Sequence, residues 1–281
     1  MFKFRYAFAV GSALAVLVSS SSAITIIGTF VADGGALPGG VGNAGPAGSM
    51  AGGGTLTSIF NTAASYWENA ILDTFTVNIT YGWQSLSGGT LGVHNLLAQS
   101  GTPNRETDGV IRFDNDAATL WFADSTPLDH SEYGTYNEFT SNLGGGTMNV
   151  GRVYTGATGN ASGRYDLLSV AMHEIGHSLG LSSANNSFVA GNGDLDVDVT
   201  SPRPFSGAAI PTVSGAHLNL ANALMFPSVS TGRRNLITDA DVIANMEISQ
   251  FTQYNPVPEP ASMVALGVGA LAVIRRRRKN G

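Results

Sequence analysis

The amino-acid sequence predicts an α+β fold in which β-strands lie between two helices along the chain. Three observations predict it. Apolar residues recur at helical spacing over Leu56–Ile71. Residues Thr74–Tyr81 alternate between polar and apolar, as a half-buried strand does. A second apolar helix is predicted within residues 166–181, downstream of the strands.

The middle of the chain holds the remaining predicted strands, at Val110–Phe113, Leu120–Phe122 and Met148–Tyr154. Residues 24–54 are expected to be a flexible lead-in, because Gly34–Gly54 is rich in glycine. The roughly 230 residues between the two end segments suffice for one domain with a sizeable core. We place this domain at residues 55–255.

The N-terminus has the three parts of a secretory signal peptide, predicted to cover residues 1–23. Two basic residues precede the apolar run Ala7–Val18, which is too short to span a bilayer comfortably. Ser19–Ala23 then supplies small residues for cleavage after Ala23. Export of the protein is therefore expected.

The C-terminus, residues 256–281, combines Val257-Pro-Glu-Pro260, the short apolar stretch 261–274 and a basic cluster at 275–279. This pattern resembles the PEP-CTERM sorting signal of Gram-negative bacteria. The resemblance implies a membrane transpeptidase as partner, transient anchoring in the inner membrane, and delivery to the cell envelope or extracellular matrix. The basic cluster would remain cytoplasmic. A permanent C-terminal anchor is the alternative.

Composition excludes two other classes of protein. The chain has no cysteine, so neither disulfides nor a cysteine-based latency switch can form. Residues 24–256 contain seven Arg, no Lys and nineteen Asp or Glu, a formal net charge of −12. Such an acidic surface is not expected to bind nucleic acid.

The run Ala171-Met-His-Glu-Ile-Gly-His-Ser-Leu-Gly-Leu181 carries the strongest functional pattern. His173 and His177 are four residues apart, so on a helix both imidazoles project from one face. That spacing suits two nitrogen ligands on one zinc ion, and Glu174 is placed to reach a water on the metal without ligating it. The alternative is a pair of ordinary core or surface histidines.

Two glycines strengthen the metal interpretation, because each costs roughly 1 kcal/mol against alanine inside a helix. Gly176 lies within the motif and Gly180 follows it. A glycine at position 180 is expected where the helix ends and the chain turns sharply.

The motif with its following glycine resembles the metzincin signature, in which a third histidine comes three residues after that glycine. Ser183 occupies this position here. Among the five histidines, His217 is the best candidate for third ligand, because Leu224–Pro227 after it resembles a methionine turn around Met225. This order resembles the leishmanolysin-type branch of the metzincins.

The resemblance implies a metzincin-like α+β fold, with a twisted mixed β-sheet over the active-site helix and a smaller C-terminal lobe closing the cleft. Carboxylates are the alternative third ligands: Asp194, Asp196 and Asp198. His94 and His130 are expected to be solvated. Asp239 and Asp241 are expected at a helix start. The acidic run Asn192–Asp198 is also compatible with calcium, although it lacks the glutamate of an EF-hand loop.

The predicted function is an exported zinc-dependent endopeptidase that hydrolyses peptide bonds in peptides or proteins. Its catalytic residue would be Glu174, the general base for a zinc-activated water, and its metal ligands would be His173, His177 and His217. The alternative is a non-catalytic envelope or matrix protein that keeps the zincin fold. A carboxylate beside the ligands favours the enzyme, because a structural zinc site needs no base.

Overall fold

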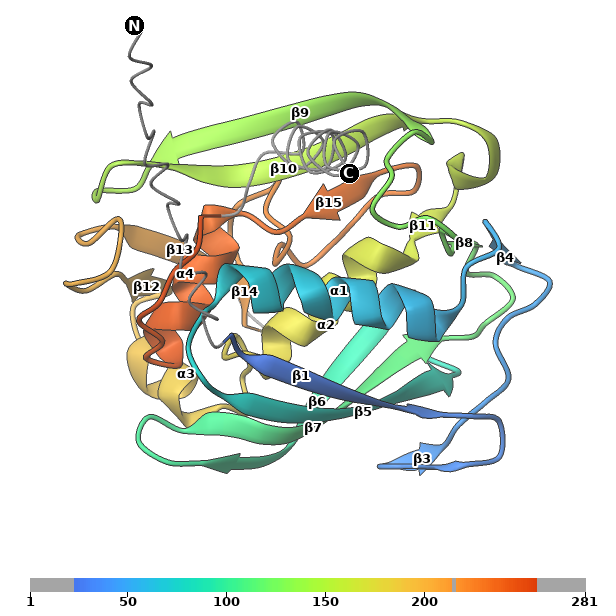
Figure 1. Cartoon of the computed structure of the whole chain (residues 1–281), viewed down its shortest axis with the longest axis horizontal. Coiled ribbons are helices and arrows are strands. Elements are labelled where there is room, and N and C mark those ends of the chain that lie inside the picture. Colours follow the sequence, from blue (N-terminus) through green and yellow to red (C-terminus); the bar gives the residue numbers. More distant parts are fainter. Residues whose placement is uncertain (1–22, 214–215, 257–281) are drawn as a thin grey trace, which may run out of the picture.

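The computed structural model describes residues 23–213 and 216–256. It is an α+β fold in which a mixed sheet packs against helices (Figure 1). The elements are β1 (Thr25–Val31), β2 (Ala36–Leu37), β3 (Gly40–Val41), β4 (Met50–Ala51), α1 (Leu56–Ala70), β5 (Thr76–Gln84), β6 (Gly92–Ser100), β7 (Arg105–Asp114), β8 (Trp121–Phe122), β9 (Tyr133–Asn142), β10 (Thr147–Ala157), the 3₁₀ turn η1 (Gly159–Ala161), β11 (Tyr165–Asp166), α2 (Leu167–Ser178), α3 (Asn186–Gly191), β12 (Asp196–Asp198), β13 (Ala209–Val213), β14 (His217–Leu218), β15 (Arg234–Leu236) and α4 (Asp239–Ile248).

The main sheet has the strand order β1-β5-β7-β6. Strands β1, β5 and β7 run parallel, whereas β6 at the edge runs antiparallel to β7. Helices α1 and α2 lie above this sheet in Figure 1, and a second sheet, β15-β10-β9, lies above them. The prediction of a mixed sheet packed against helices is confirmed.

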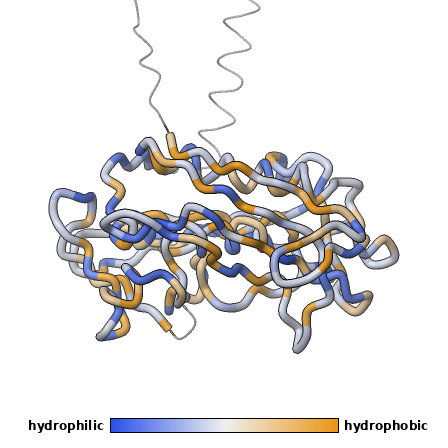
Figure 2. The backbone as a smooth tube through the Cα atoms, turned by 90° about the horizontal axis from the view of Figure 1, so that it is seen from below, coloured by the Kyte–Doolittle hydropathy of each residue, from blue (hydrophilic) through white to orange (hydrophobic). Residues whose placement is uncertain are grey.

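Helix α1 joins the main sheet to α2 through its buried face. The ring of Phe60 stacks on that of Tyr81 in β5 with centroids 3.9 Å apart. On the same helix, the indole N–H of Trp67 donates to the carbonyl of Met172 in α2, at 2.9 Å. Figure 2 shows hydrophobic and hydrophilic residues interleaved along the tube, as expected where each element buries one face.

The expectation of a flexible lead-in at residues 24–54 was wrong for its first part, because Thr25–Val31 forms strand β1 of the main sheet. Every residue of β1 is in parallel register with β5, from Thr25 opposite Thr76 to Val31 opposite Gly82. Glycine serves close packing here, since a Cβ at Gly28 would lie 2.6 Å from the ring of Phe60. The following residues add the short strands β2, β3 and β4.

The two end signals lie outside the described residues, apart from the last residue of the first and the first residue of the second. The described chain starts and stops close together: Ile24 N–H donates to the carbonyl of Ile71, and Ile71 forms an isolated β-bridge with Tyr254. Within residues 23–213 and 216–256, no helix is long and apolar enough to cross a membrane.

Candidate metal centre and catalytic cleft

Helix α2 carries the sequence motif and is buried on nearly all sides. Its N-cap, Asp166, accepts from the backbone N–H of Ser169 at 3.0 Å. The helix ends at Ser178, and Leu179 is its C-cap. Gly180 follows with φ = 151°, a conformation that residues with a side chain rarely adopt. The predicted helix end at Gly180 is therefore confirmed.

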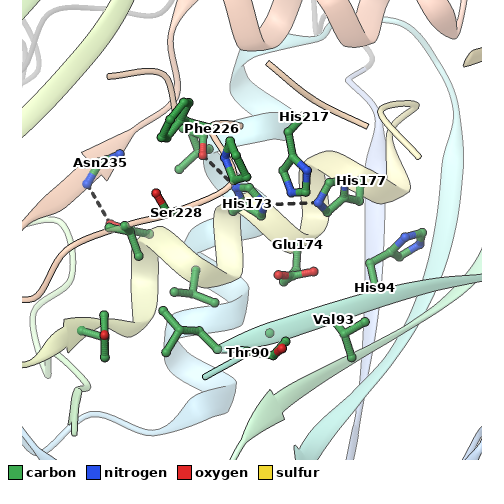
Figure 3. Close-up of a pocket in the computed structure, with 18 of the residues that line it drawn as sticks. Thr90, Val93, His94, His173, Glu174, His177, His217, Phe226, Ser228 and Asn235 are labelled. Atoms are coloured by element: carbon green, nitrogen blue, oxygen red, sulfur yellow. Dashed lines mark hydrogen bonds between the residues drawn. The ribbon is translucent and has the colours of Figure 1, made fainter. Parts of the chain in front are cut away.

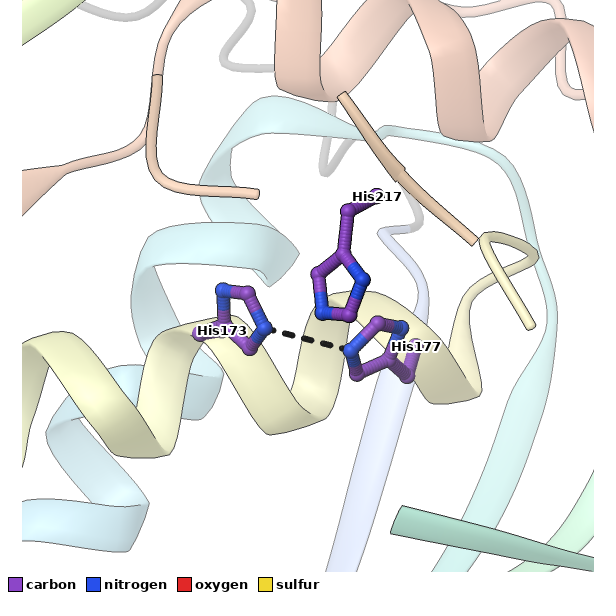
Figure 4. A group of neighbouring side chains, drawn as sticks. All are labelled: His173, His177 and His217. Carbon is purple, nitrogen blue, oxygen red and sulfur yellow. Dashed lines mark hydrogen bonds between the residues drawn. The ribbon is translucent and has the colours of Figure 1, made fainter. Parts of the chain in front are cut away.

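The structure brings His173, His177 and His217 together, although His217 lies 40 residues after His177 in the sequence. Their candidate ligand atoms all lie within 4.8 Å of one another. The ring of His217, from β14, has its centroid 5.1 Å from that of His173 and 4.9 Å from that of His177 (Figure 4).

Backbone carbonyls fix the tautomers of the two helix histidines. Nδ1 of His173 lies 2.8 Å from the carbonyl oxygen of Leu224, and Nδ1 of His177 bonds to the carbonyl of Leu181. Because a carbonyl only accepts, both Nδ1 atoms must carry the proton. In the neutral rings, both Nε2 atoms then present a lone pair.

These two lone pairs face each other, with the Nε2 atoms 3.2 Å apart (Figure 4). Burial first, and then His217, lower the pKa of His173 to about 4, so a shared proton is disfavoured near neutral pH. Burial and the neighbouring histidines also lower the pKa of His177. Two nitrogen ligands at about 2.05 Å from a tetrahedral zinc ion would be about 3.3 Å apart. The pair therefore fits a zinc ion.

The segment around Met225 packs against α2 and orients His173. Nδ1 of His173 contacts the carbonyl of Leu224, which belongs to this segment. The carboxylate of Asp241 accepts from the backbone N–H groups of Leu224 and Met225, at 3.1 and 2.9 Å. Asp241 also belongs to the capping box of α4 with Thr238, so the predicted helix-start role is confirmed and a second role is added.

Gly176 gives this segment room to approach the helix. A Cβ there would overlap Sδ of Met225 and lie 3.0 Å from Cζ2 of Trp67. Both of those side chains are fully buried. The glycine inside the motif is thus explained by close packing, which outweighs its low helix propensity.

Replacing Gly176 by Ala is expected to lower the free energy of unfolding by about 1–3 kcal/mol, because overpacking outweighs the propensity gain. Urea unfolding measures the change. Gly191→Ala at the end of α3 is the matched control, because no atom lies within 4 Å of its added Cβ. A Gly176→Ala protein as stable as the Gly191→Ala protein would contradict the packing explanation.

Glu174 lies between the histidines and strand β6 and is 5 % exposed (Figure 3). Burial raises its pKa to about 8, against a smaller lowering by the backbone of His94. Gly92 lets the strand come this close, since a Cβ there would lie 2.7 Å from Oε1 of Glu174. Sequence patterns did not reveal this contact.

A cavity of about 560 Å³ opens over these groups. One wall is the segment Gly88–His94, which leads into and begins strand β6. The apolar side chains of Val170, Phe226 and Val229 also line it. Titratable groups, candidate ligands and apolar side chains therefore share one cleft.

The expectation that His94 and His130 are solvated was wrong. The side chain of His94 is 2 % exposed, and its Nε2 lies 2.8 Å from Oε1 of the buried Glu106. The ring of His130 lies 4.3 Å from that of Tyr154, tilted by 33°, and the guanidinium of Arg234 lies 3.1 Å from its Nδ1. Burial first, and then Arg234, lower the pKa of His130 to about 4. Both are histidines with defined polar partners, which spacing alone does not reveal.

Asp194, Asp196 and Asp198, the alternative third ligands, form a separate cluster of their own. The cluster is mostly exposed, and its members do not join the histidine group among the described residues. Ser183, at the compact third-histidine position, lines the cavity and is exposed.

Comparisons with known families agree with the geometry. Residues 60–190, just under half of the chain, match the model of the matrixin family of peptidases. Residues 256–279 match the PEP-CTERM protein-sorting motif. No curated protein and no solved structure matches the chain. The matrixin match includes the helix motif and ends before His217.

Proposed function

Because the protein is a zinc metalloendopeptidase of the matrixin family, we propose that His173, His177 and His217 hold the zinc ion and that Glu174 is the general base. One observation supports this most directly: three imidazoles from two distant segments converge beside a buried carboxylate. Zinc in such a site supplies Lewis-acid chemistry, which polarises a carbonyl and acidifies a water molecule.

Glu174 accepts a proton from the attacking water and delivers it to the leaving amine. Gly92 lets strand β6 pack directly against this carboxylate, since a Cβ there would lie 2.7 Å from Oε1. A cation beside the carboxylate favours its charged form and so opposes the effect of burial on its pKa.

Strand β6 would bind the substrate peptide in an extended conformation. It is the edge strand of the main sheet, pairing with β7, and residues Gly92–His94 line the cleft. An open strand edge can pair with a peptide through main-chain hydrogen bonds. An apolar substrate side chain would then lie against Val170, Phe226 and Val229.

The third ligand comes from outside the compact motif, in the order that resembles the leishmanolysin-type branch. In this proposal the catalytic unit extends from Ile24 to Asn255. Its part after α2 is a smaller lobe that supplies His217 and Met225 and closes the cleft. Its acidic loop at Asp194–Asp198 has no assigned role.

The PEP-CTERM motif implies export, processing by an exosortase and sorting to the cell surface of a Gram-negative bacterium. We further propose cleavage of the signal peptide after Ala23 and transient anchoring in the inner membrane through residues 261–274. The released enzyme would then act on proteins in the cell envelope or extracellular matrix.

The test is metal analysis of purified residues 24–256 together with cleavage of a peptide library. We expect about one zinc ion per chain. Chelation should abolish cleavage, and added zinc should restore it. A protein that holds one zinc ion and cleaves no peptide would instead support the alternative of a non-catalytic envelope or matrix protein.

A further inference from the structure

A buried pair beside the cleft, His94 and Glu106, takes no part in the proposed chemistry. Nε2 of His94 lies 2.8 Å from Oε1 of Glu106, and the two side chains are 2 % and 1 % exposed. Gly109 provides the space, because a Cβ there would run into Oε1 of Glu106 and lie 3.2 Å from Nε2 of His94. The absence of a side chain at Gly109 thus leaves the space that this pair occupies.

The pair joins β6 to β7 where their ladder is irregular. His94 is opposite Ile111, and Glu106 is opposite Gln99. Between these two positions the register shifts twice, around Ala98. A β-bulge disrupts the backbone ladder and leaves a residue unpaired. The side-chain bond therefore ties the strands together across the segment where backbone pairing is interrupted.

Strand β6 also packs against the proposed catalytic groups. A Cβ at Gly92, two residues before His94, would lie 2.7 Å from Oε1 of Glu174. The ring of His94 lies nearly parallel to that of His177, at 22° and 6.2 Å between centroids (Figure 3). A shift of β6 at His94 would therefore change the packing around Glu174.

We propose that Glu106 and His94 form a positioning pair, which holds β6 at Gly92 against Glu174 and against the metal-binding helix. Neither side chain touches the substrate. This inference rests on the proposed role of Glu174 as general base. The pair acts by keeping that carboxylate in the reactive orientation, so its loss acts on kcat more than on KM.

The test compares Glu106→Ala with Glu106→Gln. Glu106→Ala should lower kcat by about 10- to 100-fold, the usual cost of removing an orienting partner, with wild-type zinc content and little change in KM. Glu106→Gln keeps an oxygen for His94 and should restore most of the activity. Steady-state kinetics on one fluorogenic peptide, zinc analysis and urea unfolding provide the readouts.

Glu247→Ala is the matched control, because Glu247 pairs with Arg203 at 2.9 Å with similarly small exposure, 11 % and 5 %, and does not line the cleft. It should lower stability without lowering kcat. If Glu106→Ala keeps kcat within about twofold of wild type at equal zinc content, the pair only stabilises the fold and the inference is wrong.

If Glu106→Ala fails to fold, the double variant His94→Phe with Glu106→Gln takes its place in the test. It keeps an aromatic ring at position 94 and leaves no ionisable group in the pair. A wild-type kcat in that protein overturns the inference equally, and a reduced kcat supports it. Glu174→Gln separates the two proposals. An active Glu174→Gln protein refutes the general base itself, whereas an inactive one beside a fully active Glu106→Ala protein refutes only the positioning pair.

Discussion

Glu174→Gln is expected to retain zinc and to lower kcat by at least about a hundredfold, since general-base catalysis contributes about 10²–10⁴-fold. The amide has nearly the shape of the carboxylate but cannot accept the proton of the attacking water. It fills the same space beside Gly92, so the fold should be kept. Zinc analysis and single-turnover kinetics on a casein or peptide substrate measure the two quantities separately.

Glu68→Gln is a suitable control for this change. Glu68 accepts a hydrogen bond from the backbone N–H of Ile26 at 2.8 Å. Neither residue lines the cavity. It should leave kcat unchanged. Wild-type cleavage by the Glu174→Gln protein would show that another group accepts the proton, and the mechanism proposed above would have to be abandoned.

His217→Ala should cost the protein its zinc and therefore its activity. Removing an orienting partner of a ligand usually weakens metal binding by about 10- to 100-fold, so removing a direct ligand should weaken it further. The two remaining histidines come from a single helix and cover only one side of the ion. Competition with a zinc-binding dye measures the dissociation constant.

His130→Ala is the control, because His130 is the buried histidine that contacts Arg234 and Tyr154 outside the metal group. It should keep zinc affinity, whatever its effect on stability. Undiminished zinc binding by the His217→Ala protein would remove His217 from the site and return attention to a carboxylate ligand.

The helix half of the site could be predicted from sequence because its geometry is local. His173 and His177 share one helix face by spacing alone, and Gly180 marks the end of that helix. Sequence suggested His217 only through the resemblance of Leu224–Pro227 to a methionine turn. Its nearness to the helix depends on long-range packing: the backbone N–H of Leu218 in β14 donates to the carbonyl of Met225, whose side chain packs against Gly176.

Strand β6 and the bond between His94 and Glu106 could not be predicted for a related reason. Its exposure pattern is irregular, because the strand is bulged and lies at the edge of the sheet. The bond between His94 and Glu106 spans that bulge and is invisible to periodicity. Strand β1 was missed because the glycines that follow it resemble a linker. Within the strand, Gly28 allows close contact with Phe60.

The central claim is that one zinc ion is held by two histidines of α2 and one from β14. A crystal structure of the zinc-loaded protein, with anomalous data at the zinc edge, tests it most directly. We expect one strong peak about 2.0–2.1 Å from a ring nitrogen of each of His173, His177 and His217. A peak bonded to the two helix histidines and to any side chain other than His217 would contradict the account.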